Sequence, residues 1–88
     1  MIKLKDLFIR EYVNRLTLED VSKFALKEGV TLTNSELDII YTYIKKYYYT
    51  FIYGNPKVYL EELKNKVKPI TYEKIESLYY KFKEKISK

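Results

Sequence analysis

Apolar residues recur along this chain at spacings of three and four positions, which is the period of an amphipathic α-helix, and no stretch keeps the strict alternation of a β-strand. Capping residues, glycines and prolines divide the pattern into five segments. We expect helices at about residues 4–16, 18–28, 34–53, 56–66 and 72–86. Because the connections are short, the sequence predicts one all-α domain over residues 1–88, a compact bundle of about five helices around the long central helix 34–53.

The helix ends carry recognisable signals. Thr17 and Thr33 are each followed three residues later by an acid, Asp20 and Glu36, which is the pattern of a capping box. Gly29 follows the second helix, where a left-handed C-cap is expected. These signals predict where the second and third helices begin and where the second one ends.

The boundaries of the last two helices also carry start and stop signals. Gly54 and Asn55 are expected to stop the central helix, and Asn55 followed by Pro56 predicts an N-cap with proline at the first helical position. Pro69 is expected to end the fourth helix, and Thr71 to cap the fifth.

Helical spacing also predicts which side chains face inward. The central helix is apolar on most sides, so we expect the other four to surround it. The inward positions expected on those four helices are Leu4, Leu7, Phe8 and Tyr12; Val21, Phe24 and Ala25; Tyr59, Leu60, Leu63 and Val67; and Ile75, Leu78, Tyr79, Phe82 and Ile86.

Composition restricts the chemistry. Hydrophobic residues make up 47% and charged residues 33%, which favours a folded domain over a disordered chain. The chain has no cysteine and no histidine, so it lacks thiolate ligands and the commonest general base and metal ligand. No Gly-rich phosphate loop and no nucleophile paired with a base is present. The sequence therefore predicts a protein that is not an enzyme, with no cofactor, no metal site and no small-molecule substrate.

The sequence also predicts a cytoplasmic location. No segment approaches the roughly 18 consecutive apolar residues of a membrane span. The first thirteen residues include five charged side chains, so they lack the apolar run of a signal peptide.

Tyrosine is the most unusual feature, with eleven residues in the chain and four between positions 47 and 53. Three interpretations compete: these rings form the core, they stack nucleic-acid bases beside Lys45 and Lys46, or they bind another protein chain. Aromatic residues at helical spacing are most often core. The excess over what one small core can hide makes four residues candidates for a protein interface: Tyr43, Tyr47, Tyr49 and Tyr53.

The net charge of +5 lies in the second half of the chain, because residues 1–40 carry six basic and seven acidic side chains and residues 41–88 carry eleven and five. Seven lysines at helical spacing are candidates for contact with a polyanion: Lys57, Lys64, Lys68, Lys74, Lys81, Lys85 and Lys88. The competing interpretation is that these lysines only form the solvated faces of two amphipathic helices.

One set of capping and packing positions forms a recognisable pattern: Asn14, Leu16, Thr17, Glu19, Asp20, Ala25, Gly29, Val30, Leu32, Thr33, Ile40 and Tyr43. With these residues, the segment from residue 12 to residue 86 resembles a family of short bacterial proteins of unknown function from Bacillus-type Firmicutes. The resemblance implies a small cytoplasmic helical domain and carries no activity with it. The tyrosine-rich stretch departs from the more polar segment expected there.

Two hypotheses for function follow. The first is a non-enzymatic cytoplasmic protein that acts through protein–protein interaction, as a homodimer or as a small adaptor. The alternative is a nucleic-acid-binding module that uses the lysines of the last two helices, with Tyr47 or Tyr49 stacking on bases.

Overall fold

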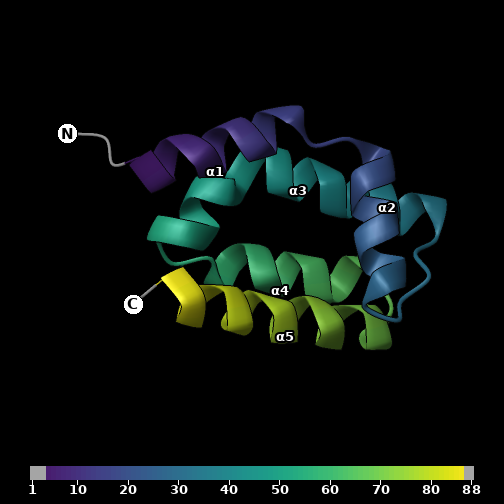
Figure 1. Cartoon of the computed structure of the whole chain (residues 1–88). Coiled ribbons are helices and arrows are strands. Elements are labelled where there is room, and N and C mark those ends of the chain that lie inside the picture. The colour runs from purple at the N-terminus through teal and green to yellow at the C-terminus, as the bar shows by residue number, and fades with distance from the viewer. Residues whose placement is uncertain (1–3, 87–88) are drawn as a thin grey trace.

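The computed structural model describes residues 4–86, and this range is built from five α-helices without a strand (Figure 1). The helices are α1 (Leu4–Arg15), α2 (Leu18–Lys27), α3 (Asn34–Tyr53), α4 (Lys57–Lys66) and α5 (Pro69–Ile86). The prediction of an all-α bundle is confirmed, and α3 has the bounds that the sequence predicts.

Both predicted capping boxes are formed. At the start of α2 the Thr17 backbone amide donates to the Asp20 carboxylate at 3.0 Å, and the Asp20 amide donates to the Thr17 hydroxyl at 3.1 Å. At the start of α3 the same pair of bonds joins Thr33 and Glu36, each at 3.1 Å. In both places the local pattern alone satisfies two backbone amides that a helix start leaves open.

The end of α2 is also as predicted. Gly29 has a φ of 85°, the left-handed conformation that favours glycine. The amide of Val30 donates to the Ala25 carbonyl at 2.8 Å, and the amide of Gly29 donates to the Leu26 carbonyl at 3.0 Å. Together these two bonds form a Schellman motif, which closes the last turn of the helix.

The start of α5 differs from the prediction, because Thr71 is not its N-cap. The helix begins at Pro69, whose fixed φ suits the first helical position, and the carbonyl of Lys68 accepts the first helical bond from Tyr72 at 2.9 Å. Thr71 therefore lies in the first turn, where it is buried.

The start of α4 also differs from the prediction by one residue. The helix begins at Lys57, so Pro56 is its N-cap and Asn55 lies one position before the N-cap. The side-chain oxygen of Asn55 accepts a bond of 3.1 Å from the Lys57 amide.

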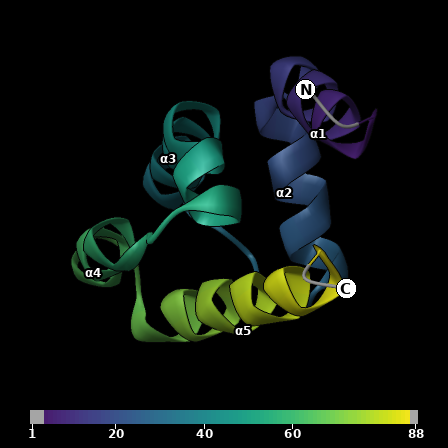
Figure 2. The same ribbon diagram turned by 90° about the vertical axis from the view of Figure 1, so that its left-hand side faces the viewer.

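The central helix α3 packs against α1, α2 and α4, whereas α5 packs against α4. In Figure 2, α1 and α2 lie to the right of α3 and α4, and α5 runs from α4 toward that side. The far half of α5 reaches α3 through side chains: Phe51 and Tyr79 meet edge to face with ring centres 5.9 Å apart. Four helices thus contact α3, as predicted, but α5 does so by side chains rather than along its length.

The buried core is small. Among the side chains that the structure describes, its apolar members come from α1 to α4 and from the adjoining loops: Val13, Leu16, Val21, Ile52, Leu60, Leu63 and Val67. The inward positions predicted on α4 are confirmed, since Leu60, Leu63 and Val67 are buried and Tyr59 is half-buried. Those on α5 are half-buried at Ile75, Leu78 and Tyr79, while Phe82 is 41% exposed and the side chain of Ile86 lies outside the described part of the chain.

The inward face predicted for α1 is wrong at three of its four positions. Leu4, Phe8 and Tyr12 are 66%, 66% and 68% exposed. The helix instead turns Val13 toward α3, because a helix with one main neighbour buries only the side that meets it. Phe24 on α2 is likewise half-exposed rather than buried.

Candidate functional site

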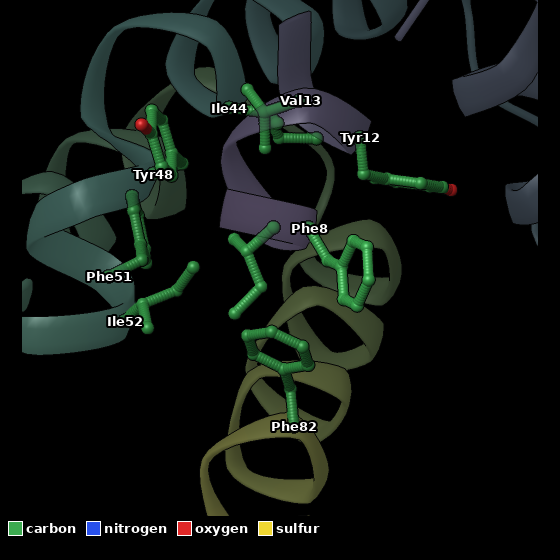
Figure 3. A pocket seen from close by; sticks show the side chains of 9 residues that line it. Phe8, Tyr12, Val13, Ile44, Tyr48, Phe51, Ile52 and Phe82 are labelled. Atoms are coloured by element: carbon green, nitrogen blue, oxygen red, sulfur yellow. The ribbon is translucent and has the colours of Figure 1, made fainter. Parts of the chain in front are cut away.

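An apolar groove of about 470 Å³ lies where α1, α3 and α5 meet (Figure 3). Two helices supply four lining residues each and α5 supplies one: Phe8, Ile9, Tyr12 and Val13; Ile44, Tyr48, Phe51 and Ile52; and Phe82. In Figure 3 Phe82 projects from α5 toward α1 and Ile52. Every lining side chain is aliphatic or aromatic, so the groove suits another apolar surface and offers no charged group to orient a polar ligand.

Two lysines hold the helices in place around this groove. Nζ of Lys45 on α3 donates to the carbonyls of Val13 and Asn14, at 2.8 Å and 2.9 Å, in the last turn of α1. Nζ of Lys83 on α5 donates to the carbonyl of Ile52 near the end of α3 at 3.0 Å. Carbonyls at a helix C-terminus lack intrahelical partners and carry partial negative charge, so an ammonium group stabilises them there.

The exposed side of α1 borders the groove. Leu4, Phe8 and Tyr12 follow one another at intervals of four residues, so they form one continuous stripe on the helix surface. We call this stripe the α1 face. Phe8 and Tyr12 belong to the α1 face and also line the groove, which makes the two a single apolar surface.

Two of the four predicted interface tyrosines lie between helices of the chain itself. The rings of Tyr47 and Tyr59 stack with centres 3.9 Å apart and planes 15° apart. The hydroxyl of Tyr43 donates to Oε1 of Glu62 on α4 at 2.5 Å. This bond, with burial, raises the pKa of Tyr43 to about 12. Tyr43 and Tyr47 are therefore half-buried and join α3 to α4.

The other two predicted interface tyrosines are exposed near α1. Tyr49 is 66% exposed, and its ring centre lies 4.8 Å from that of Tyr53. The hydroxyl of Tyr53 donates to the carboxylate of Asp6 in the first turn of α1, and this bond raises the pKa of Tyr53 to about 12. Tyr49 and Tyr53 remain candidates for contact with another chain.

The predicted polyanion-contact lysines do not lie on helices that run parallel. Lys57, Lys64, Lys68, Lys81 and Lys85 are exposed and Lys74 is half-buried, while Lys88 lies outside the described residues. Helix α5 diverges from α4 toward the side of α1 (Figure 2), so the lysines at its far end move away from those of α4. That these lysines bind a polyanion stays a prediction.

Glu36 has a carboxylate that is buried among the described residues. The sequence predicts its bonds to Thr33 but not its contacts with Lys68. Beyond its capping box, its Oε2 accepts a bond of 2.9 Å from the backbone amide of Lys68, and Nζ of Lys68 lies 3.6 Å from its Oε1. Burial alone raises the pKa of Glu36, but the bonds from Lys68 and Thr33 outweigh it and hold the pKa below the ordinary value of 4.5. The buried hydroxyl of Thr71 also helps to lower this pKa, although it forms no hydrogen bond of normal geometry among the described residues.

These contacts make Glu36 a link between the starts of α3 and α5. The carboxylate is kept ionised, and backbone amides of two helix starts occupy its oxygens. The capping-box pattern in the sequence predicts the bond between Glu36 and Thr33, but it contains no signal for the bond between Glu36 and Lys68, which lies 32 positions later.

In the part of the chain that the structure describes, no group of three or more Asp, Glu, His or Cys side chains is arranged to hold a metal ion. Within residues 4–86 no helix combines the length and apolar character needed to cross a bilayer.

Comparisons with known proteins add no relative: no family model, no curated protein and no solved structure matches this chain. The resemblance to short proteins of Bacillus-type bacteria stays a prediction from the sequence. The function must therefore be argued from the surface of the molecule itself.

Proposed function

We propose that this chain is a non-enzymatic helical protein that acts by binding another protein chain through the α1 face and the groove beside it. The observation that carries the proposal is the exposure of Leu4, Phe8 and Tyr12, each about two-thirds open to solvent, next to an apolar groove. Contiguous apolar surface of this kind marks interaction sites on soluble proteins.

The character of the surface favours a protein partner over a small ligand. Pockets for small molecules combine an apolar lining with a few polar groups that fix the ligand's orientation. Here the lining is apolar and aromatic throughout, and the nearby ammonium groups of Lys45 and Lys83 already bond to helix-end carbonyls. Aromatic side chains beside an apolar pocket are instead typical of the centre of a protein interface.

The proposed interface differs from the one that the tyrosine pattern alone suggests. Tyr43 and Tyr47 have partners on α4, so moving them toward a partner chain would break contacts within the bundle. Tyr53 is bonded to Asp6 on α1, and Tyr49 lies against Tyr53. These two side chains are therefore placed to form a polar and aromatic rim beside the α1 face.

Site-specific photo-crosslinking in cells that express the chain tests this proposal. A benzophenone-bearing phenylalanine analogue replaces Phe8 in one variant and Tyr80 in the matched control, because Tyr80 is an aromatic residue that is 60% exposed on α5. We expect irradiation to link position 8, and not position 80, to a protein that mass spectrometry identifies. Absence of any protein adduct at position 8, or equal adducts at both positions, would contradict the proposal.

A further inference from the structure

We infer that the partner on the α1 face is a second copy of this chain, in a two-fold dimer in which α1 of each copy lies against the groove of the other. The inference rests on the proposed function, since it names the occupant of the same surface. Three features of the chain point to this occupant: self-complementary shape, surplus exposed area and mixed charge on α1.

The shape argument comes from the position of the projecting side chains. In a two-fold dimer the same patch must serve both partners, so a self-complementary patch needs projections and a recess side by side. Phe8 and Tyr12 project from α1 and at the same time form one wall of the groove (Figure 3). A second copy facing the first can place its own Phe8 or Tyr12 in this groove while offering an identical groove in return.

The area argument compares this chain with a typical monomer. A folded monomer of 10.7 kDa is expected to expose about 5,500 Å². This chain exposes 6560 Å², which is about 1,000 Å² more than that expectation. A stable interface of standard size buries about 800 Å² on each partner. The surplus is therefore of the size that one protein–protein interface covers on each partner.

The charge argument concerns the flanks of the α1 face. Helical spacing places Lys5 and Glu11 on the two flanks of this face and Arg15 at its end, so both signs are present there, and α1 as a whole has a net charge of only +1. Two such helices can approach without strong repulsion, and opposite charges of the two copies can pair at the rim of the interface. A strongly acidic partner would find more positive charge on residues 41–88 than here.

Measurement of the mass of the full chain in solution tests the inference. Sedimentation equilibrium over a concentration series should show twice the 10.7-kDa chain mass at the upper end. Phe8→Glu places a charge in the centre of the α1 face and should raise the dimer Kd by at least about tenfold. Val58→Glu is the matched control, because Val58 is 65% exposed on α4, and it should follow the wild-type curve.

A cross-linking measurement checks the geometry without altering the α1 face. Because the chain has no cysteine, Glu11→Cys creates a single thiol at the rim of the α1 face, and a short bismaleimide should convert it to a covalent dimer. Glu61→Cys on the exposed side of α4 should stay monomeric under the same conditions. Far-UV circular dichroism verifies that every variant folds, and Tyr12→Lys replaces Phe8→Glu if that variant does not.

The outcomes separate the inference from the proposed function. Wild-type chain that stays at 10.7 kDa at every concentration, or Phe8→Glu that dimerises like wild type, overturns the inference. If position 8 then still cross-links to a different protein in cells, the proposed function stands with another partner. If position 8 links to nothing, both fail.

Discussion

The backbone amide of Lys68 donates a hydrogen bond of 2.9 Å to Oε2 of Glu36, a residue 32 positions earlier in the chain. Lys68 occupies the N-cap position of α5, so Glu36 supplies from α3 the carboxylate that a capping box would place within α5 itself. The carboxylate of Glu36 thereby accepts from both N-cap amides, that of Thr33 before α3 and that of Lys68 before α5. The connection fixes the start of α5 against the start of α3.

The first prediction follows from this connection. We expect Glu36→Gln to lower the free energy of unfolding at neutral pH by about 2 kcal/mol, because a buried amide cannot accept the same set of bonds as a carboxylate. The matched control is Asp20→Asn, which alters the same capping motif at an exposed site and should cost about 1 kcal/mol or less. Urea denaturation of both variants measures the difference, and equal losses would show that the bond to Lys68 contributes nothing.

Glu36 also gives the stability a pH dependence with a definite sign. Its pKa is lower in the folded chain than the ordinary value of 4.5, so the unfolded chain binds more protons in this range. The stabilisation is complete above pH 4.5 and is lost as the pH falls through the lower folded pKa. Unfolding free energies measured from pH 6 downward should therefore fall more steeply for wild type than for Glu36→Gln. Parallel curves would contradict this assignment.

The second prediction concerns Lys45, which joins α3 to the last turn of α1. Lys45→Met keeps most of the aliphatic stem but removes both bonds to the Val13 and Asn14 carbonyls, so we expect a loss of about 1–2 kcal/mol. Lys46→Met is the control, since Lys46 is exposed and adjacent in the chain. Hydrogen exchange should show faster opening of α1 in the first variant only. Unchanged protection of α1 would mean that packing at Val13 holds the helix without this lysine.

The third prediction tests the bond between Tyr43 and Glu62. In a double-mutant cycle with Tyr43→Phe and Glu62→Gln, we expect a coupling energy of about 1 kcal/mol. Because the pKa of Tyr43 rises from 10 to about 12 on folding, this stabilisation is present below pH 10 and is lost as the pH rises through 12. Ultraviolet titration should lose one late-ionising phenol in Tyr43→Phe. Independent effects of the two substitutions would argue that the hydroxyl bonds to water instead.

The fourth prediction concerns Gly29 at the end of α2. A Cβ built there meets nothing within 4 Å, so the cost of Gly29→Ala comes from the left-handed backbone alone and should be about 1 kcal/mol. Gly29→Asn should cost less, because asparagine tolerates this conformation better than alanine. Thermal and urea unfolding of the two variants give the comparison. An alanine variant as stable as wild type would mean that the loop after α2 adapts to a different conformation.

Local signals account for what the sequence determined correctly. The capping boxes at Thr17 and Thr33, the left-handed Gly29 and the stop after Tyr53 depend on residues within about four positions of each other, and all are formed as predicted. The buried positions of α4 were also predictable, because α4 packs between two neighbours and its single apolar stripe must face them. The all-α class, the order of the helices and most helix ends are therefore determined by short stretches of sequence.

Only the tertiary structure decided which apolar surfaces find a partner inside the chain. Helical spacing puts Leu4, Phe8 and Tyr12 on one face but does not say whether a neighbour covers it, and here all three are about two-thirds exposed. In the same way, the four tyrosines with the same pattern of aromatic spacing separate into Tyr43 and Tyr47, which meet α4, and Tyr49 and Tyr53, which remain at the surface. The bond from Lys68 to Glu36 and those from Lys45 to α1 also join residues more than thirty positions apart. Spacing within a helix fixes the direction of a side chain, whereas burial depends on what the rest of the chain places opposite it, and that is a property of the assembled bundle.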